Sequence, residues 1–203
     1  MIPKKTVIAV DIDDVLAASA EGFLEFSNKT YNTNLSIPEY SEHWAQMWQI
    51  DHDAVTLRVN DFYDSDTIAR YVHKAGSQEV LTKLAEQYTI IAITARQRRS
   101  QDITNNWIHA RYPGVFGDVQ YAGIYDAPLV EEQMSMTKGS LFASNEVSYV
   151  IDDQLKHCLA AAELGIATIL FGDYPWNQAD ELPKNIQRCA DWQAVGDYFA
   201  TRG

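Results

Sequence analysis

The sequence is poor in cysteine and in positive charge, and it has no long apolar run. Cys158 and Cys189, its two cysteines, form neither a metal-ligand spacing nor a disulfide framework, and we expect them to be small apolar fillers in a reducing compartment. Its 16 lysines and arginines face 28 acidic residues, a formal net charge of -12 that argues against binding to polymeric nucleic acid or to an anionic membrane. Since no apolar stretch approaches membrane-spanning length, we expect a soluble cytoplasmic protein.

The 203 residues, 46% of them hydrophobic, are enough for one good core and a small accessory domain. Short apolar segments alternate with helical patterns along the chain. The predicted strands are 7–10, 88–94, 118–122, 147–151 and 167–171, and the main predicted helices are 15–34, a helix beginning at Ser77, 100–111, 138–144, 154–164 and 191–201. This alternation predicts an α/β fold with a parallel sheet and right-handed crossovers.

The chain between the first two predicted strands has a different character from the rest. From about residue 35 to about residue 75 it shows no convincing buried strand. This stretch is dense in aromatic residues, namely Tyr40, Trp44, Trp48, Phe62, Tyr63 and Tyr71. We therefore predict a small helical insertion, with Pro38, Asp51 and Ser65 as candidate helix starts.

Polar side chains follow the predicted core strands at the point where each strand ends. They are Asp11, Asp13 and Asp14 after the first strand, Thr94 after the second, and Asp152 and Asp153 after the strand at 147–151. The carboxyl ends of parallel strands share one edge of the sheet, and ligands of such sheets bind there. Because crowded carboxylates repel one another and oxygen ligands favour a hard cation, we predict Mg²⁺ at this edge.

Each of these residues also has a structural interpretation. A single aspartate can form a helix N-cap or solvate a turn, Thr94 is a common type of strand residue, and Lys138 could be an exposed helix lysine. The ordered set favours a functional site, because carboxylates, a hydroxyl, a lysine and a cation are the components of phosphoryl transfer through an aspartyl phosphate. Arg96 is the best candidate for a further phosphate contact, through its bidentate guanidinium.

This set resembles the haloacid dehalogenase-like superfamily over nearly all of the chain. The four motifs occur in order as Asp11-Ile12-Asp13-Asp14-Val15, Thr94, Lys138 and Asp152-Asp153. The resemblance implies a Rossmann-like core and a Mg²⁺-dependent mechanism in which Asp11 is the nucleophile and Asp13 is the general acid and base. It also implies that Thr94, Ala95 and Lys138 bind phosphate, and that Asp11, Asp152 and the backbone carbonyl of Asp13 bind the metal.

Two aspartates have no assigned role at this point. The superfamily often has glycine where this chain has Asp14, and Asp14 could simply form a helix N-cap. Asp153 could orient Lys138 or a metal-bound water, or form the N-cap of the next helix. Asp13 itself favours a phosphatase, because dehalogenases of the superfamily lack a carboxylate at this position.

Within the superfamily the chain looks like the 5′(3′)-deoxyribonucleotidase branch. The segment Ile93-Thr94-Ala95-Arg96, the pair Phe62-Tyr63 and the insertion after the first strand carry this resemblance. It implies a catalytic core at 1–15 and 77–203, a helical cap at 16–76, and a 5′-nucleotidase for (deoxy)nucleoside monophosphates. The aromatic residues of the insertion could stack on a nucleobase or form its own small core, and the candidates are Phe23, Trp44, Trp48 and Tyr63.

Other functions stay open on the sequence alone. A phosphatase for a sugar phosphate or another small metabolite would use the same core residues. A signalling receiver domain also uses aspartates, a threonine, a lysine and Mg²⁺, but its phospho-accepting aspartate precedes the threonine and lysine, whereas here the second acidic pair follows Lys138. We expect a small phosphorylated substrate, most simply a nucleotide, and no polymeric nucleic acid or membrane partner, and we leave a homodimer open.

Overall fold

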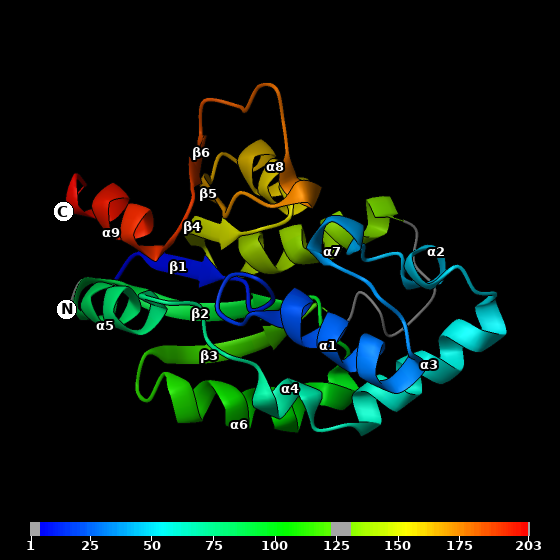
Figure 1. The fold of residues 1–203 in the computed structure, drawn as a ribbon. Coiled ribbons are helices and arrows are strands. Elements are labelled where there is room, and N and C mark those ends of the chain that lie inside the picture. The colour runs from blue at the N-terminus through cyan, green and yellow to red at the C-terminus, as the bar shows by residue number, and fades with distance from the viewer. Residues whose placement is uncertain (1–4, 123–130, 203) are drawn as a thin grey trace.

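A six-stranded parallel sheet forms the centre of the structure (Figure 1). The structure is a computed structural model that describes residues 5–122 and 131–202, without the side chains of 131–137. The strand order is β3-β2-β1-β4-β5-β6. The strands are β1 (Val7–Val10), β2 (Thr89–Thr94), β3 (Phe116–Tyr121), β4 (Val147–Asp152), β5 (Ala167–Phe171) and β6 (Ile186–Cys189). The chain leaves β1 for β2 on one side and later returns to β4 on the other side, so the strand order reverses at β1. The α/β class predicted from the sequence is confirmed.

Helices cover both faces of the sheet because the central strands are apolar on both faces. Along β1, Ile8 and Val10 join one buried cluster, which also contains residues of α5 (Ser77–Gln87), α6 (Gln101–Arg111) and α9 (Trp192–Ala200). Val7 and Ala9 point to the opposite face, where they join a cluster with residues of α7 (Glu131–Ser144) and α8 (Leu155–Glu163). The result is a three-layer α/β/α core.

Residues 16–76, which we call the cap segment, contain helices and no strand in the described structure. These helices are α1 (Ser19–Tyr31), the 3₁₀ turn η1 (Ile37–Glu39), α2 (Trp44–Trp48), α3 (His52–Asp64) and α4 (Thr67–Arg70). Figure 1 shows α1, α2 and α3 beyond the carboxyl ends of β1 and β2. Asp51 starts α3 as predicted, since its side chain accepts a hydrogen bond from the amide of Ala54.

Two predicted helices differ from the observed ones, and one observed strand was not predicted. The first helix begins at Ser19 and not at 15, because Asp14 has a φ of 55° and the amides of Leu16 and Ala17 both donate to the carbonyl of Ile12 in a tight turn. The helix expected at 138–144 begins at Glu131, within a run of good helix-forming residues. The edge strand β6 was not predicted, because only two of its four residues are apolar.

None of the helices among the described residues combines the length and the apolar composition that crossing a membrane requires.

Candidate active site

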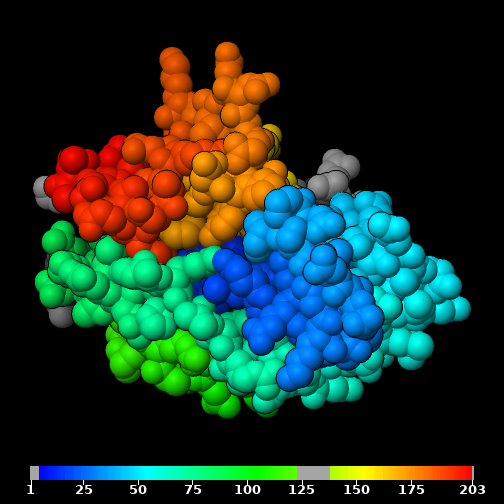
Figure 2. Space-filling view, viewed as in Figure 1, coloured from blue at the N-terminus to red at the C-terminus, as the bar shows by residue number. Residues whose placement is uncertain are grey.

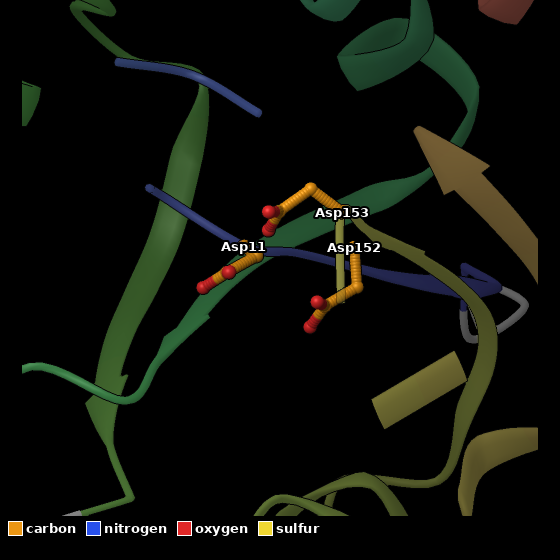
Figure 3. Close-up of side chains that lie close together, drawn as sticks. All are labelled: Asp11, Asp152 and Asp153. Carbon is orange, nitrogen blue, oxygen red and sulfur yellow. The ribbon is translucent and has the colours of Figure 1, made fainter. Parts of the chain in front are cut away.

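The carboxyl ends of β1, β2 and β4 bring the predicted motifs together at the point where the strand order reverses. Asp11 follows β1, Thr94 ends β2 and Asp152 ends β4, and β1 is hydrogen-bonded to both of the other strands. Figure 3 shows the side chains of Asp11, Asp152 and Asp153 close together at this edge. One carboxylate oxygen of each lies within 4.8 Å of the others. This is the position at which open α/β sheets bind ligands.

Lys138, in the middle of α7, lies fully buried between two of these carboxylates. Its Nζ is 2.7 Å from Oδ2 of Asp152 and 3.0 Å from Oδ1 of Asp11. The attraction of both aspartates, against the cost of burial, raises the pKa of Lys138 above its ordinary value. Lys138 is therefore a fixed positive charge beside Asp11.

The buried cluster holds more negative charge than Lys138 can neutralise. Burial raises the pKa of Asp11 to about 8, and the neighbouring charge of Asp152 adds to that rise while Lys138 opposes it. Burial and the carboxylates of Asp152, Asp14 and Asp11 likewise raise the pKa of Asp153. Oδ1 of Asp11 is buried and accepts no well-directed hydrogen bond in the described structure. An oxygen-only cluster with excess buried negative charge, in which the contact of Asp11 Oδ1 with Lys138 is poorly directed, fits a divalent cation.

Asp13 lies apart from this cluster and is held by Arg96. The guanidinium is bidentate, with Nη2 2.7 Å from Oδ1 and Nε 2.9 Å from Oδ2 of Asp13, and Nη1 donates to Thr104 of α6. The side chain of Asp13 is 35% exposed, against 6% for Asp11. Arg96, predicted to contact phosphate, thus binds the carboxylate that the motif assigns to acid and base catalysis. The Thr94 hydroxyl accepts a hydrogen bond from the backbone amide of Arg96.

The two aspartates left without a role have different environments. Asp14 accepts hydrogen bonds from the amide of Ala20 and the hydroxyl of Ser19, so it supports the start of α1. Lys74 lies 3.6 Å from the same carboxylate. Asp153, by contrast, joins the acidic cluster with Asp11 and Asp152. Its side chain therefore does not serve mainly as a helix N-cap.

A family model described as 5′-nucleotidase, deoxy (pyrimidine), cytosolic type C protein matches residues 5–124 of the chain. The chain belongs to this family. It is a phosphoric monoester hydrolase of the haloacid dehalogenase-like superfamily, as the motifs predicted. Over 197 residues the chain is also 22% identical to BH1399 of Halalkalibacterium halodurans, a protein provisionally named as a nucleotidase, and the match covers 94% of this chain and 91% of that protein.

Solved structures share the fold of this nucleotidase-family chain. The haloacid dehalogenase-like protein SP0104 of Streptococcus pneumoniae has a TM-score of 0.70 at 17% identity, covering 96% of this chain and 98% of that one. D,D-heptose 1.7-bisphosphate phosphatase of B. bronchiseptica, solved with magnesium and phosphate, has a TM-score of 0.58 at 16% identity, covering 98% and 99% of the two chains. At these identities the likeness concerns the fold alone.

In this nucleotidase-family chain, a cavity of about 410 Å³ lies between the acidic cluster and the cap segment. The motif residues that line it are Asp11, Asp13, Asp14, Ala95, Arg96, Lys138 and Asp153. Its aromatic lining comes from the cap segment, namely Phe23, Tyr40, Trp44, Phe62, Tyr63 and Tyr71. The site therefore combines a charged floor with an apolar, aromatic wall.

The four aromatic candidates of the insertion occupy two kinds of position. Phe23, Trp44 and Tyr63 line the cavity, and Phe23 stacks on Trp44 with ring centroids 4.4 Å apart. Trp48 is not among the lining residues. It is buried in the cluster below the wall, and its Nε1 donates to the hydroxyl of Ser27. Trp44 and Trp48 thus differ in whether they line the cavity, while Phe23 both lines the cavity and packs in the buried cluster.

The structure adds residues to the site that the motifs did not indicate. His157 of α8 is buried, lines the cavity and has an Nδ1 without a hydrogen-bond partner in the described structure. Lys156 forms an ion pair with Glu42 that links α8 to the cap segment. Trp176, in the loop after β5, donates from Nε1 to Asp153. Only the aromatic content of that loop, Tyr174-Pro175-Trp176, distinguishes it in the sequence.

Proposed function

We propose that this protein is a Mg²⁺-dependent phosphomonoesterase that acts through an aspartyl-phosphate intermediate, with (deoxy)nucleoside monophosphates as its substrates. The observation that carries the proposal is the contact of buried Lys138 with both Asp11 and Asp152, beside a cluster that fits a divalent cation. Asp11, Asp152 and the backbone carbonyl of Asp13 would hold the ion, with Asp153 next to them. Residues 16–76 would form the cap over a core of 1–15 and 77–203.

The nucleophile would be the carboxylate of Asp11. Its oxygen attacks phosphorus, the bond from phosphorus to the ester oxygen breaks, and the leaving oxygen takes a proton from Asp13. In the second half, Asp13 accepts a proton from water while the water oxygen attacks phosphorus and releases Asp11. A bound divalent ion supplies positive charge that screens the phosphate from the attacking carboxylate.

The remaining residues would bind and orient the phosphate. Lys138 places a fixed cation beside Asp11, where negative charge gathers during transfer. Thr94 and the backbone at Ala95 lie at the end of β2, next to the nucleophile strand. Arg96 holds Asp13 in a defined orientation at the cavity through its bidentate contact with that carboxylate.

The preference for a nucleotide rests on the wall of the cavity. A planar base gains from stacking on aromatic side chains, and the cap segment presents several of them opposite the charged floor. A sugar phosphate offers no such face. The same core with a sugar phosphate as substrate is the competing function, and a panel of phosphate monoesters assayed with Mg²⁺ separates the two.

Removal of the metal should abolish activity. We expect phosphatase activity to disappear in excess EDTA and to return when Mg²⁺ is added, because the cluster of Asp11, Asp152 and Asp153 has only oxygen ligands and an uncompensated charge. The measurement is hydrolysis of p-nitrophenyl phosphate in metal-depleted buffer during a Mg²⁺ titration. Full activity in excess EDTA would reject the metal assignment.

Substitutions at Trp44 and Trp48 should separate base stacking from core packing. We expect Trp44→Leu to lower kcat/KM for a nucleotide by about 5- to 150-fold, corresponding to a stacking loss of about 1–3 kcal/mol, with a much smaller change for p-nitrophenyl phosphate. Such a differential loss is expected when the contact involves a remote part of the substrate.

Trp48→Leu is the matched control, because Trp48 lies in the same helix but does not line the cavity. It should lower thermal stability and affect both substrates alike. If Trp44→Leu behaves in the same way, or if the unmodified protein prefers sugar phosphates, the nucleotidase assignment fails while the phosphatase assignment stands.

A further inference from the structure

Asp153 receives a hydrogen bond from a tryptophan that lies outside all of the motifs. Nε1 of Trp176 is 2.7 Å from Oδ2 of Asp153, and the side-chain nitrogen Nε2 of Gln154 donates to the same oxygen at 3.0 Å. Trp176 belongs to the 3₁₀ turn η3 (Pro175–Asn177) in the loop after β5. Both groups thus donate a hydrogen bond to the same oxygen of Asp153, whose neighbours are Asp11 and Asp152.

The backbone of this loop is fixed by buried polar contacts. Gly172 turns the chain with a φ of 80°, and a Cβ at this position would lie 2.2 Å from the ring of Tyr174. Asn177 is fully buried, and its amide donates to the carbonyls of Asp153 and Phe171. Arg188 of β6 donates to Asn177 and to the carbonyl of Gly172. The loop is therefore a rigid support attached to the backbone of Asp153 itself.

The indole ring of Trp176 is held on two sides. Tyr174 stacks on it with centroids 4.5 Å apart and an interplanar angle of 5°, and the hydroxyl of Tyr174 donates to the carbonyl of Asp14. Tyr40, from the cap segment, packs edge-on at 5.1 Å. Figure 2 shows the loop after β5 (orange) against the cap segment (blue). These contacts fix the direction of the indole N–H.

We propose that Trp176 is a positioning residue for the divalent-cation site, which holds Oδ2 of Asp153 and thereby aims the other carboxylate oxygen at the cluster. The inference rests on the proposed metal site. Its physical basis is that Asp153 is buried beside Asp11 and Asp152, whose negative charges repel it. A directed donor held by a rigid loop opposes that repulsion and keeps Asp153 in place, as outer hydrogen-bond partners do in other metal sites.

The test is the Mg²⁺ response of Trp176→Phe, which keeps an aromatic ring between Tyr174 and Tyr40 but removes the N–H. Two Mg²⁺ titrations are measured: the increase in unfolding temperature without substrate, and activity. In both, we expect the Mg²⁺ concentration that gives the half-maximal effect to rise by about 10- to 100-fold. Activity at saturating Mg²⁺ should recover to near the unmodified level. Trp107→Phe is the matched control, because Trp107 also donates from Nε1, but to the carbonyl of Tyr71, and should keep the unmodified midpoint.

A double-mutant comparison tests whether Trp176 acts through Asp153. Asp153→Asn alone should raise the Mg²⁺ midpoint, and adding Trp176→Phe to it should raise the midpoint no further. Additive effects, or a Trp176→Phe protein that is less stable but has an unchanged midpoint, would overturn the inference. If Trp176→Phe does not fold, Trp176→Met replaces it in the same comparison, because the flexible methionine side chain fills the space. Additive effects, or lower stability with an unchanged midpoint, would again overturn the inference. If the unmodified protein itself shows no response to Mg²⁺, it is the proposed function that fails.

Discussion

Asp11→Asn should remove both turnover and covalent phosphorylation, whereas Asp13→Asn should remove turnover and still be phosphorylated. Asp11 is the carboxylate beside Lys138 and would form the bond to phosphorus. An amide at this position is not a nucleophile, so we expect the rate to fall by about 10⁴-fold or more. Asp13, bound by Arg96 and more exposed, would only transfer protons. Its loss should cost about 10²- to 10⁴-fold on a nucleotide, whose alkoxide leaving group needs a proton.

The leaving group separates the two roles. p-Nitrophenolate leaves without protonation, so Asp13→Asn should release about one equivalent of p-nitrophenol per enzyme and then stop, because no base activates water for the second half. Asp11→Asn should show no such burst. The two asparagine variants are isosteric controls for each other, and mass spectrometry of the rapidly quenched proteins measures the phosphoryl adduct. Equal bursts from both variants would remove the role assignment.

Lys138→Met should cost both stability and activity. In the folded protein the lysine is fully buried between Asp11 and Asp152, and methionine of similar length would leave these carboxylates without a cation. Breaking a buried ion pair in this way costs about 3–5 kcal/mol of the free energy of unfolding. Added Mg²⁺ should recover part of that loss, because it returns positive charge to the cluster. Activity should fall by at least about 10²-fold, since the charge that would face the phosphate is gone.

The comparison uses denaturant unfolding in EDTA and in Mg²⁺. Lys83→Met is the matched control, because Lys83 pairs with Glu79 on the exposed surface of α5, and we expect no measurable change in either buffer. If Lys138→Met is as stable as the unmodified protein in EDTA, the buried contacts of Lys138 do not stabilise the fold. An equal loss of stability in both buffers would show that no ion restores the charge at the cluster.

The order and type of most elements follow from local sequence. The apolar, β-branched residues of β1 and β4 predict buried parallel strands, and the polar residues that end them predict one shared edge. The edge strand β6 cannot be predicted in this way, because Gln187 and Arg188 interrupt its apolar pattern and only its pairing with β5 defines it. The start of α1 cannot be predicted in this way either, since a tight turn with a left-handed residue at Asp14 precedes the helix.

For the site, the sequence alone determined which residue types lie at the strand ends, because chemistry at a strand end depends on local order along the chain. Only the tertiary structure decided what each group contacts: Arg96 meets Asp13 across 83 residues, Trp176 reaches Asp153, and Trp44 faces the cavity while Trp48 packs below it. These contacts join segments far apart in the chain, or depend on which side of a short helix faces the core. Local periodicity carries no information on distant partners, so packing alone selects them.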